Sequence, residues 1–508
     1  MANRVKEFVR RISSQDLELY PDWDLTTPLP RQPIPDLRNT LQRYLRLIAP
    51  VVSNEEYERT QHIINEFGLS GGFGEELQGL LKKIAERKEN WVTDWWLYDM
   101  YMKNPLPLPI NSNPGMVFPI QKFSSARQEI RFAAQLLSGI LDYKTILDTR
   151  SLPIERARHN RKGQPLCMEQ YYRLFSSYRF PGRTQDQLEF IISKNGICGL
   201  NYEHSCSEGI AVIRLIEHIL EYMNECDRWK LTRYSSICER PLPKLLNWTI
   251  NEEISHTMDN AQRDISSLGN DVDLEVLRYS HYGREFPKTM NMSPDSFIQL
   301  ALQLTYYKMY GHLVPTYESA STRRYHLGRV DNIRACSIPA LEWCKSMAKK
   351  TAPKDESILL LRKAIDWQTE VMLETILGYG VDNHLLGLKQ TCIENKLPLP
   401  EIFTDEVYQK NSLFKLSTSQ VPTTKDAFMC YGAVVPDGYG AAYNPHPDNI
   451  VIVISSFKSC LKTDSKRFSS VLTVVFDEMK ELVLSNPDLA RKKASEPLTW
   501  TIPEEVGI

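Results

Sequence analysis

Long apolar runs, an excess of one charge and paired cysteines are all missing from this sequence. No run of 18 apolar residues occurs, so we expect no membrane-spanning helix. Lysine and arginine total 61 against 63 acidic residues, which argues against a nucleic-acid-binding protein, since such proteins are usually strongly basic. The ten cysteines form no C-x-x-C pair, so the sequence predicts neither a disulfide framework nor a metal site.

Two absences also indicate the cellular compartment in which the protein works. The first residues, MANRVKEFVRRISSQD, are charged throughout and lack the apolar centre of a cleaved signal peptide. Scattered cysteines without a pairing pattern are typical of a reducing environment. We therefore expect a cytoplasmic protein.

The composition that is present is that of a globular protein, with 42% hydrophobic and 24% charged residues. A chain of 508 residues is too long for one compact core and predicts two or three domains. Helical spacing of apolar residues predicts helices over 41–48, 57–67, 125–147, 210–223, 293–309, 358–377 and 469–484. Strands are expected over 188–192, 197–202 and 450–457, and a glycine-rich helix break over 67–77. Alternating helices and strands predict an α/β or α+β fold.

The stretch NYEHSCSEGI, residues 201–210, places His204 where a predicted strand ends and a helix begins. Histidine titrates near neutrality, so His204 could take a proton from a hydroxyl and return it to a leaving group, with Glu208 nearby. The alternative is a structural histidine near a turn, and the short pattern alone leaves it open. We interpret Cys206 as a small buried side chain, because nothing marks it as an activated nucleophile.

Two further stretches offer polar groups for catalysis or anion binding. LSTSQVP carries Ser417, Thr418 and Ser419, whose hydroxyls could donate to a developing oxyanion, unless the stretch is merely an exposed edge strand. HYGREFPKTMNMSPDSF places Arg284 and Lys288 before a helix start, where an anionic group such as a nucleotide phosphate would be favoured. A solvated basic turn would explain the second pattern equally well.

Aromatic and glycine residues gather in the last two stretches, 314–334 and 430–445. Glycines, prolines and tyrosines in CYGAVVPDGYGAAYNP imply a tightly turning backbone. Tyrosine faces attract quaternary ammonium groups through cation–π interactions, although any single tyrosine more often serves packing.

In this order, the stretches resemble the carnitine/choline acyltransferase family over nearly the whole chain. The strings that carry the resemblance are PLPRQPIPDLRNTLQRYL, WWLYDMY, GQPLCMEQYYRLFSSYRFPGRTQD, YEHSCSEG, SPDSFIQLALQL, PTYESAS, LSTSQVP and VVPDGYGAAYNP. The resemblance implies an α/β fold of two chloramphenicol-acetyltransferase-like domains with an active-site tunnel at their interface. It implies a monomer that uses acetyl-CoA as co-substrate, with no permanently bound cofactor. We expect residues 1–88 and 246–508 to form the choline- and CoA-binding domain and residues 89–245 the catalytic-histidine domain.

Roles follow residue by residue from the resemblance. His204 matches the catalytic base, Glu208 its companion carboxylate, and Ser419 the hydroxyl that donates to the oxyanion. Residues that the resemblance assigns to CoA are Gly283, Arg284, Lys288, Ser293, Asp295, Ser321 and Gln420. Residues that it assigns to the substrate pocket are Tyr101, Tyr317, Ser319, Val330, Asp331, Asn332, Asn383, Ser417, Thr418, Met429 and Tyr431.

The acceptor implied by the resemblance is choline rather than carnitine. Carnitine enzymes hold a carboxylate with an arginine in D-R-H-L-L and with threonines in R-T-D-T. This chain has Asn383 and Val330 in those contexts, with Asp331 adjacent. A buried carboxylate needs a paired cation, whereas choline has no carboxylate to pair. The expected reaction is direct acetyl transfer, in which His204 activates the choline hydroxyl and no acyl-enzyme forms.

One long segment of the family is missing after Asp186, where Thr184-Gln185-Asp186 runs directly into the strand that starts at 188. A piece of roughly 100 residues should carry strands and helices, so we expect its loss to expose an apolar face. Two alternatives to an active choline enzyme therefore stay open. One is a carnitine acetyltransferase, and the other is a catalytically defective variant.

Overall fold

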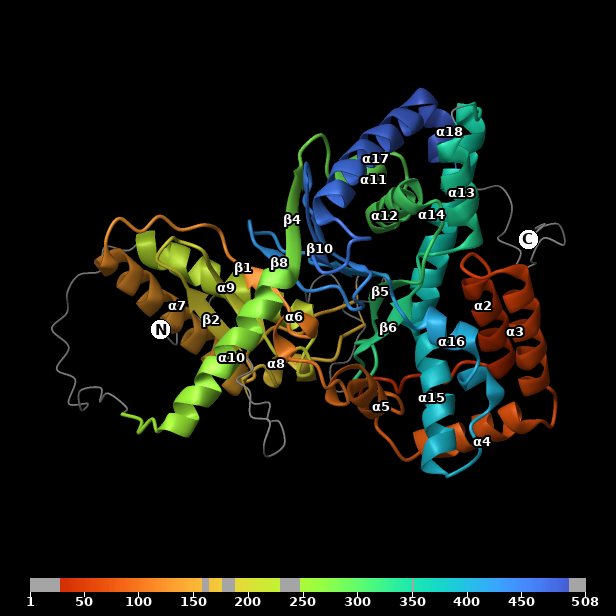
Figure 1. The fold of residues 1–508 in the computed structure, drawn as a ribbon, viewed down its shortest axis with the longest axis horizontal. Helices are drawn as coiled ribbons and strands as arrows, with labels where there is room; N and C mark the ends of the chain where they lie inside the picture. The colour runs from red at the N-terminus through yellow and green to blue at the C-terminus, as the bar shows by residue number, and fades with distance from the viewer. Residues whose placement is uncertain (1–27, 158–163, 176–187, 229–246, 350, 493–508) are drawn as a thin grey trace.

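The computed structural model describes residues 28–157, 164–175, 188–228, 247–349 and 351–492. Two β-sheets form its framework, one of four strands and one of six (Figure 1). Helices and strands alternate around both sheets, which confirms the predicted α/β class. Asp186 and the charged first residues lie outside the described part.

The four-stranded sheet has the order β2-β3-β1-β8 and is antiparallel throughout. Its strands are β1 (Gly115–Val117), β2 (Leu188–Ile192), β3 (Cys198–Tyr202) and β8 (Phe428–Cys430). The strands predicted over 188–192 and 197–202 are confirmed as β2 and β3, which pair as a hairpin, and Gly196 provides the positive φ, 86°, that its turn requires. Met116 lies opposite Leu200 on one side and Met429 on the other, so β8 joins this sheet from far along the chain.

The six-stranded sheet has the order β4-β10-β9-β7-β5-β6. Its strands are β4 (Val272–Tyr279), β5 (Thr316–Ser321), β6 (Val330–Ile333), β7 (Leu416–Gln420), β9 (Tyr439–Pro445) and β10 (Ile450–Phe457). Strand β7 pairs in parallel with β5 and β9 and lies inside the sheet, which excludes the exposed-edge interpretation of LSTSQVP. Every residue of β10 is buried, as its apolar run predicts.

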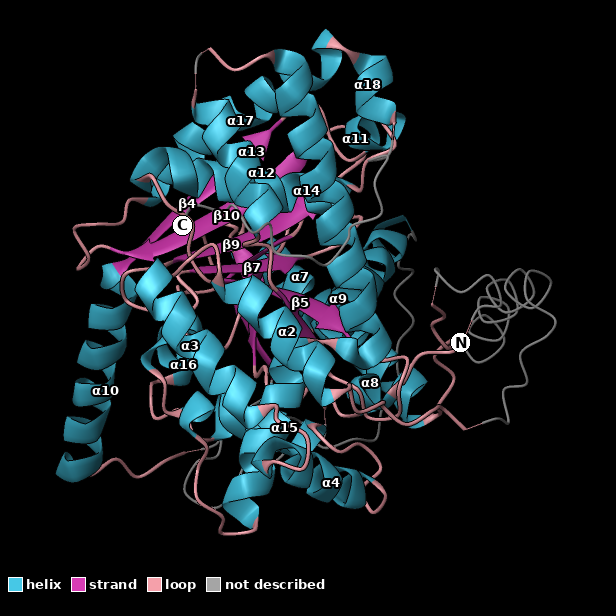
Figure 2. Ribbon diagram, turned by 90° about the vertical axis from the view of Figure 1, so that its right-hand side faces the viewer, coloured by secondary structure: helices cyan, strands magenta, loops and turns pink. Residues whose placement is uncertain are grey.

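Helices cover one face of the six-stranded sheet (Figure 2). These are α11 (Glu285–Thr289), α12 (Pro294–Tyr310), α13 (Ile338–Ala348), α14 (Lys354–Glu374), α17 (Ser465–Ser485) and α18 (Pro487–Arg491). Phe297, Trp343 and Phe476 lie fully buried in their shared core. The predicted closing helix is α17, but the short α18 follows it because Asn486 and Pro487 start a new helix.

A second core joins the N-terminal helices to a later part of the chain. It holds side chains of α2 (Leu37–Ile48), α3 (Asn54–Phe67), α4 (Phe73–Ala85), α5 (Thr93–Leu97), α15 (Val381–Glu394), η3 (Glu401–Phe403) and α16 (Glu406–Asn411). The glycine-rich break falls between α3 and α4, as predicted. This packing unites residues 37–97 with residues 381–411, while the exact domain limits stay a prediction.

The remaining helices lie beside one of the two sheets or on the connections between their strands. They are the π-helix η1 (Tyr98–Met102), α6 (Leu108–Asn111), α7 (Ala126–Asp148), α8 (Glu169–Tyr172), α9 (Gly209–Arg228), α10 (Glu252–Asp271) and the π-helix η2 (Thr375–Tyr379). Among the described residues, no helix has the length and apolarity needed to cross a membrane.

An apolar face is exposed on α7. Ile130, Leu137 and Leu141 lie 7 and 11 positions apart, on one side of the helix, and each is more than half exposed. Ile191 on the edge strand β2 is also exposed. These residues agree with the expectation that loss of the segment uncovers apolar surface.

Candidate active site

His204 lies in the loop between β3 and α9, at the junction that the sequence predicts. Strand β3 is buried along most of its length and α9 packs its apolar stripe beside it, so both ends of the loop are anchored. The imidazole is 19% exposed, and the Tyr101 ring stacks on it with centroids 5.1 Å apart. A partly buried histidine at a fixed junction can present one ring nitrogen to a substrate.

Two oxygen atoms face Nδ1 of His204. The Tyr101 hydroxyl lies 2.9 Å from Nδ1, and Oε2 of Glu208 lies 3.8 Å from it. A carboxylate on this side favours the tautomer with the proton on Nδ1, so we assign the proton there. Nε2 then carries the lone pair that a general base needs.

Burial lowers the pKa of His204 below its ordinary value of 6.5, and the Arg329 cation lowers it further. The Glu208 carboxylate acts in the opposite direction and partly offsets both effects. The imidazole is therefore neutral at pH 7, which is the protonation state that can accept a proton.

Arg329 holds both the backbone of the His204 loop and the Glu208 carboxylate, although no role was predicted for it from the sequence. Its Nε donates to Glu208 at 2.8 Å, while its two terminal nitrogens donate to the carbonyls of Ser205 and His204 at 2.7 and 2.9 Å. The guanidinium also lies over the Trp96 ring. Arg329 is 121 positions from Glu208 in the chain, so no local pattern could have paired them.

The hydroxyl residues of β7 divide between the two faces of its sheet. The Thr418 hydroxyl donates to the Tyr317 carbonyl at 2.8 Å and accepts from Gln299 of α12 at 2.9 Å. Side chains alternate along a strand, so Ser417 and Ser419 lie on the face away from α12. Ser419 is half-buried, and the Ser417 carbonyl accepts from the Tyr431 hydroxyl at 2.9 Å.

Buried aromatic and sulfur-containing side chains accompany His204. Tyr101 packs edge-on against Trp96, and the Tyr202 ring lies 5.6 Å from the imidazole. Burial raises the pKa of the Tyr101, Tyr202, Tyr317 and Tyr431 hydroxyls, so all four stay neutral. Met429, whose sulfur lies 3.7 Å from the Tyr202 hydroxyl, brings β8 to this cluster.

The residues that stand where carnitine enzymes hold the substrate carboxylate form one buried group. Asn383 of α15 donates from its side chain to the Val330 carbonyl at 3.0 Å, and its backbone N–H donates to Asp331 at 3.1 Å. Burial, reinforced by Asp382, raises the pKa of Asp331 to about 7. Asn332 accepts from the Glu318 N–H at 3.1 Å.

The candidate CoA residues lie around α11 and the start of α12. A Cβ on Gly283 would lie 2.3 Å from the His446 carbonyl, so only glycine fits where these segments meet. Lys288 is half exposed and pairs with Glu285 at 2.7 Å, and Arg284 also lies beside Glu285. Ser293 caps α12, accepting from the Ser296 N–H.

Further candidate CoA and substrate residues lie inside and around the six-stranded sheet. Asp295 accepts from the Tyr443 hydroxyl at 2.6 Å. Burial and the neighbouring Asp295 carboxylate hold the pKa of Glu318 well above its usual range. Ser319 donates to the Tyr317 hydroxyl at 3.2 Å, and Ser321 and Gln420 are exposed at their strand ends.

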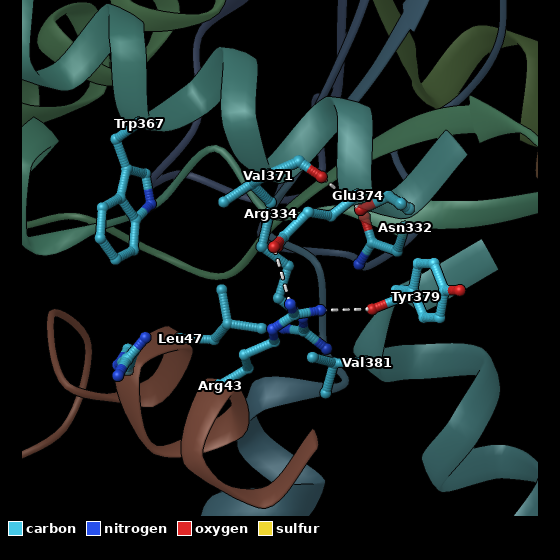
Figure 3. A pocket seen from close by; sticks show the side chains of 12 residues that line it. Arg43, Leu47, Asn332, Arg334, Trp367, Val371, Glu374, Tyr379 and Val381 are labelled. Carbon is cyan, nitrogen blue, oxygen red and sulfur yellow. Dashed lines mark hydrogen bonds and ion pairs between the residues drawn. The ribbon is translucent and has the colours of Figure 1, made fainter. Parts of the chain in front are cut away.

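A separate pocket with about 410 Å³ of empty space, part of it open to solvent, lies between α2, β6 and α14 (Figure 3). Its lining residues are Arg43, Arg46, Leu47, Asn332, Arg334, Trp367, Val371, Glu374, Thr375, Tyr379, Gly380 and Val381. Arg43 donates to Glu374 and to the Tyr379 carbonyl, and Arg334 holds Asp382 with two nitrogens. His204, Glu208 and Ser419 do not line this pocket. Within the described ranges, no cluster of histidine, cysteine and acidic residues could hold a metal ion.

This sequence is similar to a known family and to individual proteins named as its members. The family model described as choline/carnitine O-acyltransferase matches residues 32–189 and 186–474. Choline O-acetyltransferase of Sus scrofa is 35% identical over 613 aligned positions, which cover 92% of this chain and 96% of that protein. Carnitine O-acetyltransferase of Mus musculus is 32% identical, over 90% of this chain and 94% of that protein.

A solved structure of an epimerization domain from the third module of tyrocidine synthetase B is a more distant match. Its TM-score is 0.37 at 10% identity, over 78% of this chain and 96% of that one.

The two parts of the family match meet at residues 186–189. The alignment with the porcine enzyme is longer than this whole chain, so that relative contains segments with no counterpart here. Both findings confirm the predicted gap after Asp186. The match covers far more than half of the chain, and the chain is therefore an acyltransferase that belongs to the choline/carnitine O-acyltransferase family.

Proposed function

We propose that this chain transfers the acetyl group of acetyl-CoA to the hydroxyl of choline, forming acetylcholine and CoA. The observation that carries the proposal is His204, held neutral by burial with both nearby oxygens on its Nδ1 side. Relatives named choline O-acetyltransferase, from Sus scrofa and Homo sapiens, support choline as the acceptor. Cytoplasmic location, a monomeric state and a role in neurotransmitter synthesis stay predictions.

The reaction proceeds in one complex of enzyme, acetyl-CoA and choline. Nε2 of His204 accepts the choline hydroxyl proton as the alkoxide oxygen attacks the thioester carbonyl. The Ser419 hydroxyl donates to the oxyanion of the tetrahedral intermediate. When the carbon–sulfur bond breaks, the imidazolium returns its proton to the CoA thiolate, so no acyl-enzyme is needed. Glu208 stabilises the transient imidazolium, and Arg329 keeps Glu208 in place.

The charge around Asn383 supports choline over carnitine. A carnitine carboxylate buried here would need a cation, but Asn383 is neutral and its amide already donates to Val330. The neighbouring Arg334 is engaged by both oxygens of Asp382. The aromatic cluster of Tyr101, Tyr317 and Tyr431 suits a quaternary ammonium group, which both acceptors carry.

A carnitine acetyltransferase is the second candidate, since the mouse carnitine enzyme is nearly as similar to this chain. Parallel assays of the purified chain with acetyl-CoA and either acceptor separate the two. We expect kcat/KM for choline to exceed that for carnitine by at least about 100-fold, the scale set by one unpaired buried charge. A carnitine value equal to or above the choline value would reject the proposed acceptor.

The pH dependence of kcat should report His204. Because its pKa is lowered, the acid limb of the profile should have its midpoint below 6.5. Glu208 is the largest influence that raises this pKa, so Glu208→Gln should move the midpoint to still lower pH and also reduce the plateau. Initial rates from pH 5 to 8 at saturating substrates measure both effects. A midpoint that stays in place in the variant would contradict the assigned contact.

Asp331 should make stability depend on pH. Its folded pKa of about 7 lies above its ordinary 3.8, so its contribution to stability is complete below pH 3.8 and is lost as pH rises through about 7. Asp331→Asn should therefore gain stability relative to the parent between pH 5 and pH 8, by at most about 3 kcal/mol. Urea denaturation at both pH values checks this, and parallel changes in the two proteins would refute it.

A further inference from the structure

The segment 421–427 carries the chain from one sheet to the other. Strand β7, with Ser419, belongs to the six-stranded sheet, and β8, with Met429, belongs to the four-stranded sheet that also holds β3. His204 follows β3 directly. The position of this crossing segment therefore affects how the candidate oxyanion donor sits relative to the candidate base.

One carboxylate of α9 binds the crossing segment through three donors. Oε1 of Glu217 accepts from the Thr424 N–H at 2.7 Å, from the Thr424 hydroxyl at 2.8 Å and from the Thr423 hydroxyl at 3.4 Å. Hydrogen bonds to an ionised carboxylate are stronger than neutral ones. Glu217 is half-buried, and of its two partners Thr423 is buried and Thr424 is exposed.

The crossing segment is also held from the six-stranded sheet. The Val421 N–H donates to the Tyr443 carbonyl at 2.8 Å, and Asn444 donates from its side chain to the Thr423 carbonyl at 3.1 Å. Thr423 is buried between the two sets of contacts. In this clamp, strand β9 holds Val421 and Thr423 from one side, and Glu217 holds Thr423 and Thr424 from the other.

We infer that Glu217 is a positioning residue, which sets the separation of Ser419 from His204 by joining α9 to the crossing segment. Helix α9 begins at Gly209, directly after Glu208, and is a rigid rod of 20 residues. Glu217 lies about two turns along the same helix. The carboxylate that faces His204 therefore lies next to the first residue of the helix that carries the carboxylate of the crossing segment. This inference rests on the proposed function.

Loss of the clamp should affect the chemical step more than substrate binding. A displacement of about 1 Å between catalytic groups can cost on the order of 100-fold in rate. The candidate substrate residues on β5, β6 and α15 make none of the contacts of Glu217. Glu217→Ala should therefore lower kcat by at least about tenfold and change both KM values by less than about threefold.

Two variants make the test specific. Glu217→Gln keeps a carbonyl oxygen that can accept from Thr424, so it should recover most of the activity. Glu221, which is exposed, lies one turn further along α9 and pairs with half-buried Lys425 of the same segment at 2.9 Å. Because exposed ion pairs contribute little, Glu221→Ala should change kcat by less than about twofold. Equal kcat in Glu217→Ala and the parent, or equal losses in Glu217→Ala and Glu221→Ala, would overturn the inference.

Hydrogen exchange separates this inference from the proposed function. The amide of Thr424 and those of β8 should exchange at least about tenfold faster in Glu217→Ala than in the parent, whether or not the chain acetylates choline. Unchanged exchange would reject the clamp itself. A parent chain that is inactive, but in which Glu217→Ala shows the faster exchange, would reject the proposed function and leave the clamp supported.

Discussion

Replacing His204 with alanine should lower kcat for choline acetylation by about 10²–10⁴-fold, the range that a general base contributes. In the assigned tautomer, Nε2 is the only ring nitrogen with a free lone pair, because Tyr101 and Glu208 both face the protonated Nδ1. The Tyr101 ring stacks on the imidazole. Removing the imidazole therefore leaves a partly open space beside Tyr101 rather than a buried charge. Initial rates at saturating acetyl-CoA and choline measure the loss.

Two controls make this result interpretable. Thermal melting of the variant should stay cooperative, because a fall in activity through unfolding would say nothing about the base. Cys206→Ala changes a neighbouring residue of the same loop and should leave kcat within about twofold, since direct transfer needs no thiol nucleophile. Equal rates for His204→Ala and the parent would remove His204 from the mechanism.

Replacing Arg329 with methionine should destabilise the protein by about 3–5 kcal/mol and nearly abolish activity, because it leaves the Glu208 carboxylate buried without its cation. Both side chains are at most 12% exposed, so water cannot take over the pairing. The variant also loses the two donors that hold the carbonyls of Ser205 and His204. Urea denaturation and kcat measure the two effects.

Arg329→Lys is the matched variant for this prediction. It keeps the positive charge but cannot reproduce three donors in a planar fork. We expect most of the stability to return and kcat to stay well below that of the parent, since the His204 loop is no longer fixed. A methionine variant as stable and active as the parent would show that the Glu208 pair does not organise the site.

Local patterns predicted part of this fold. The helices predicted over 57–67 and 293–309 and the strand predicted over 450–457 follow from short-range periodicity, and the structure has each of them. Which strands pair did not follow in the same way. The order β4-β10-β9-β7-β5-β6 and the transfer of β8 to the other sheet depend on contacts between residues far apart in the chain.

The candidate site shows the same division. His204 and Glu208 are four positions apart, so their proximity could be read directly from the sequence. Arg329 and Glu217 act across 121 and about 200 positions, and only the folded chain brings them to their partners. The resemblance supplied roles for residues such as Asn383. It did not reveal that the side-chain amide of Asn383 donates to the Val330 carbonyl or that burial raises the pKa of Asp331.

The central claim, direct acetyl transfer to choline by a chain that lacks a family segment, is tested by following both products in one reaction. Purified protein, acetyl-CoA and choline are mixed, acetylcholine is quantified by mass spectrometry, and free CoA thiol is titrated in the same samples. The account predicts equal amounts of acetylcholine and CoA, with no acetylated protein at any time. CoA release without acetylcholine, or an acetylated protein that precedes the product, would contradict it.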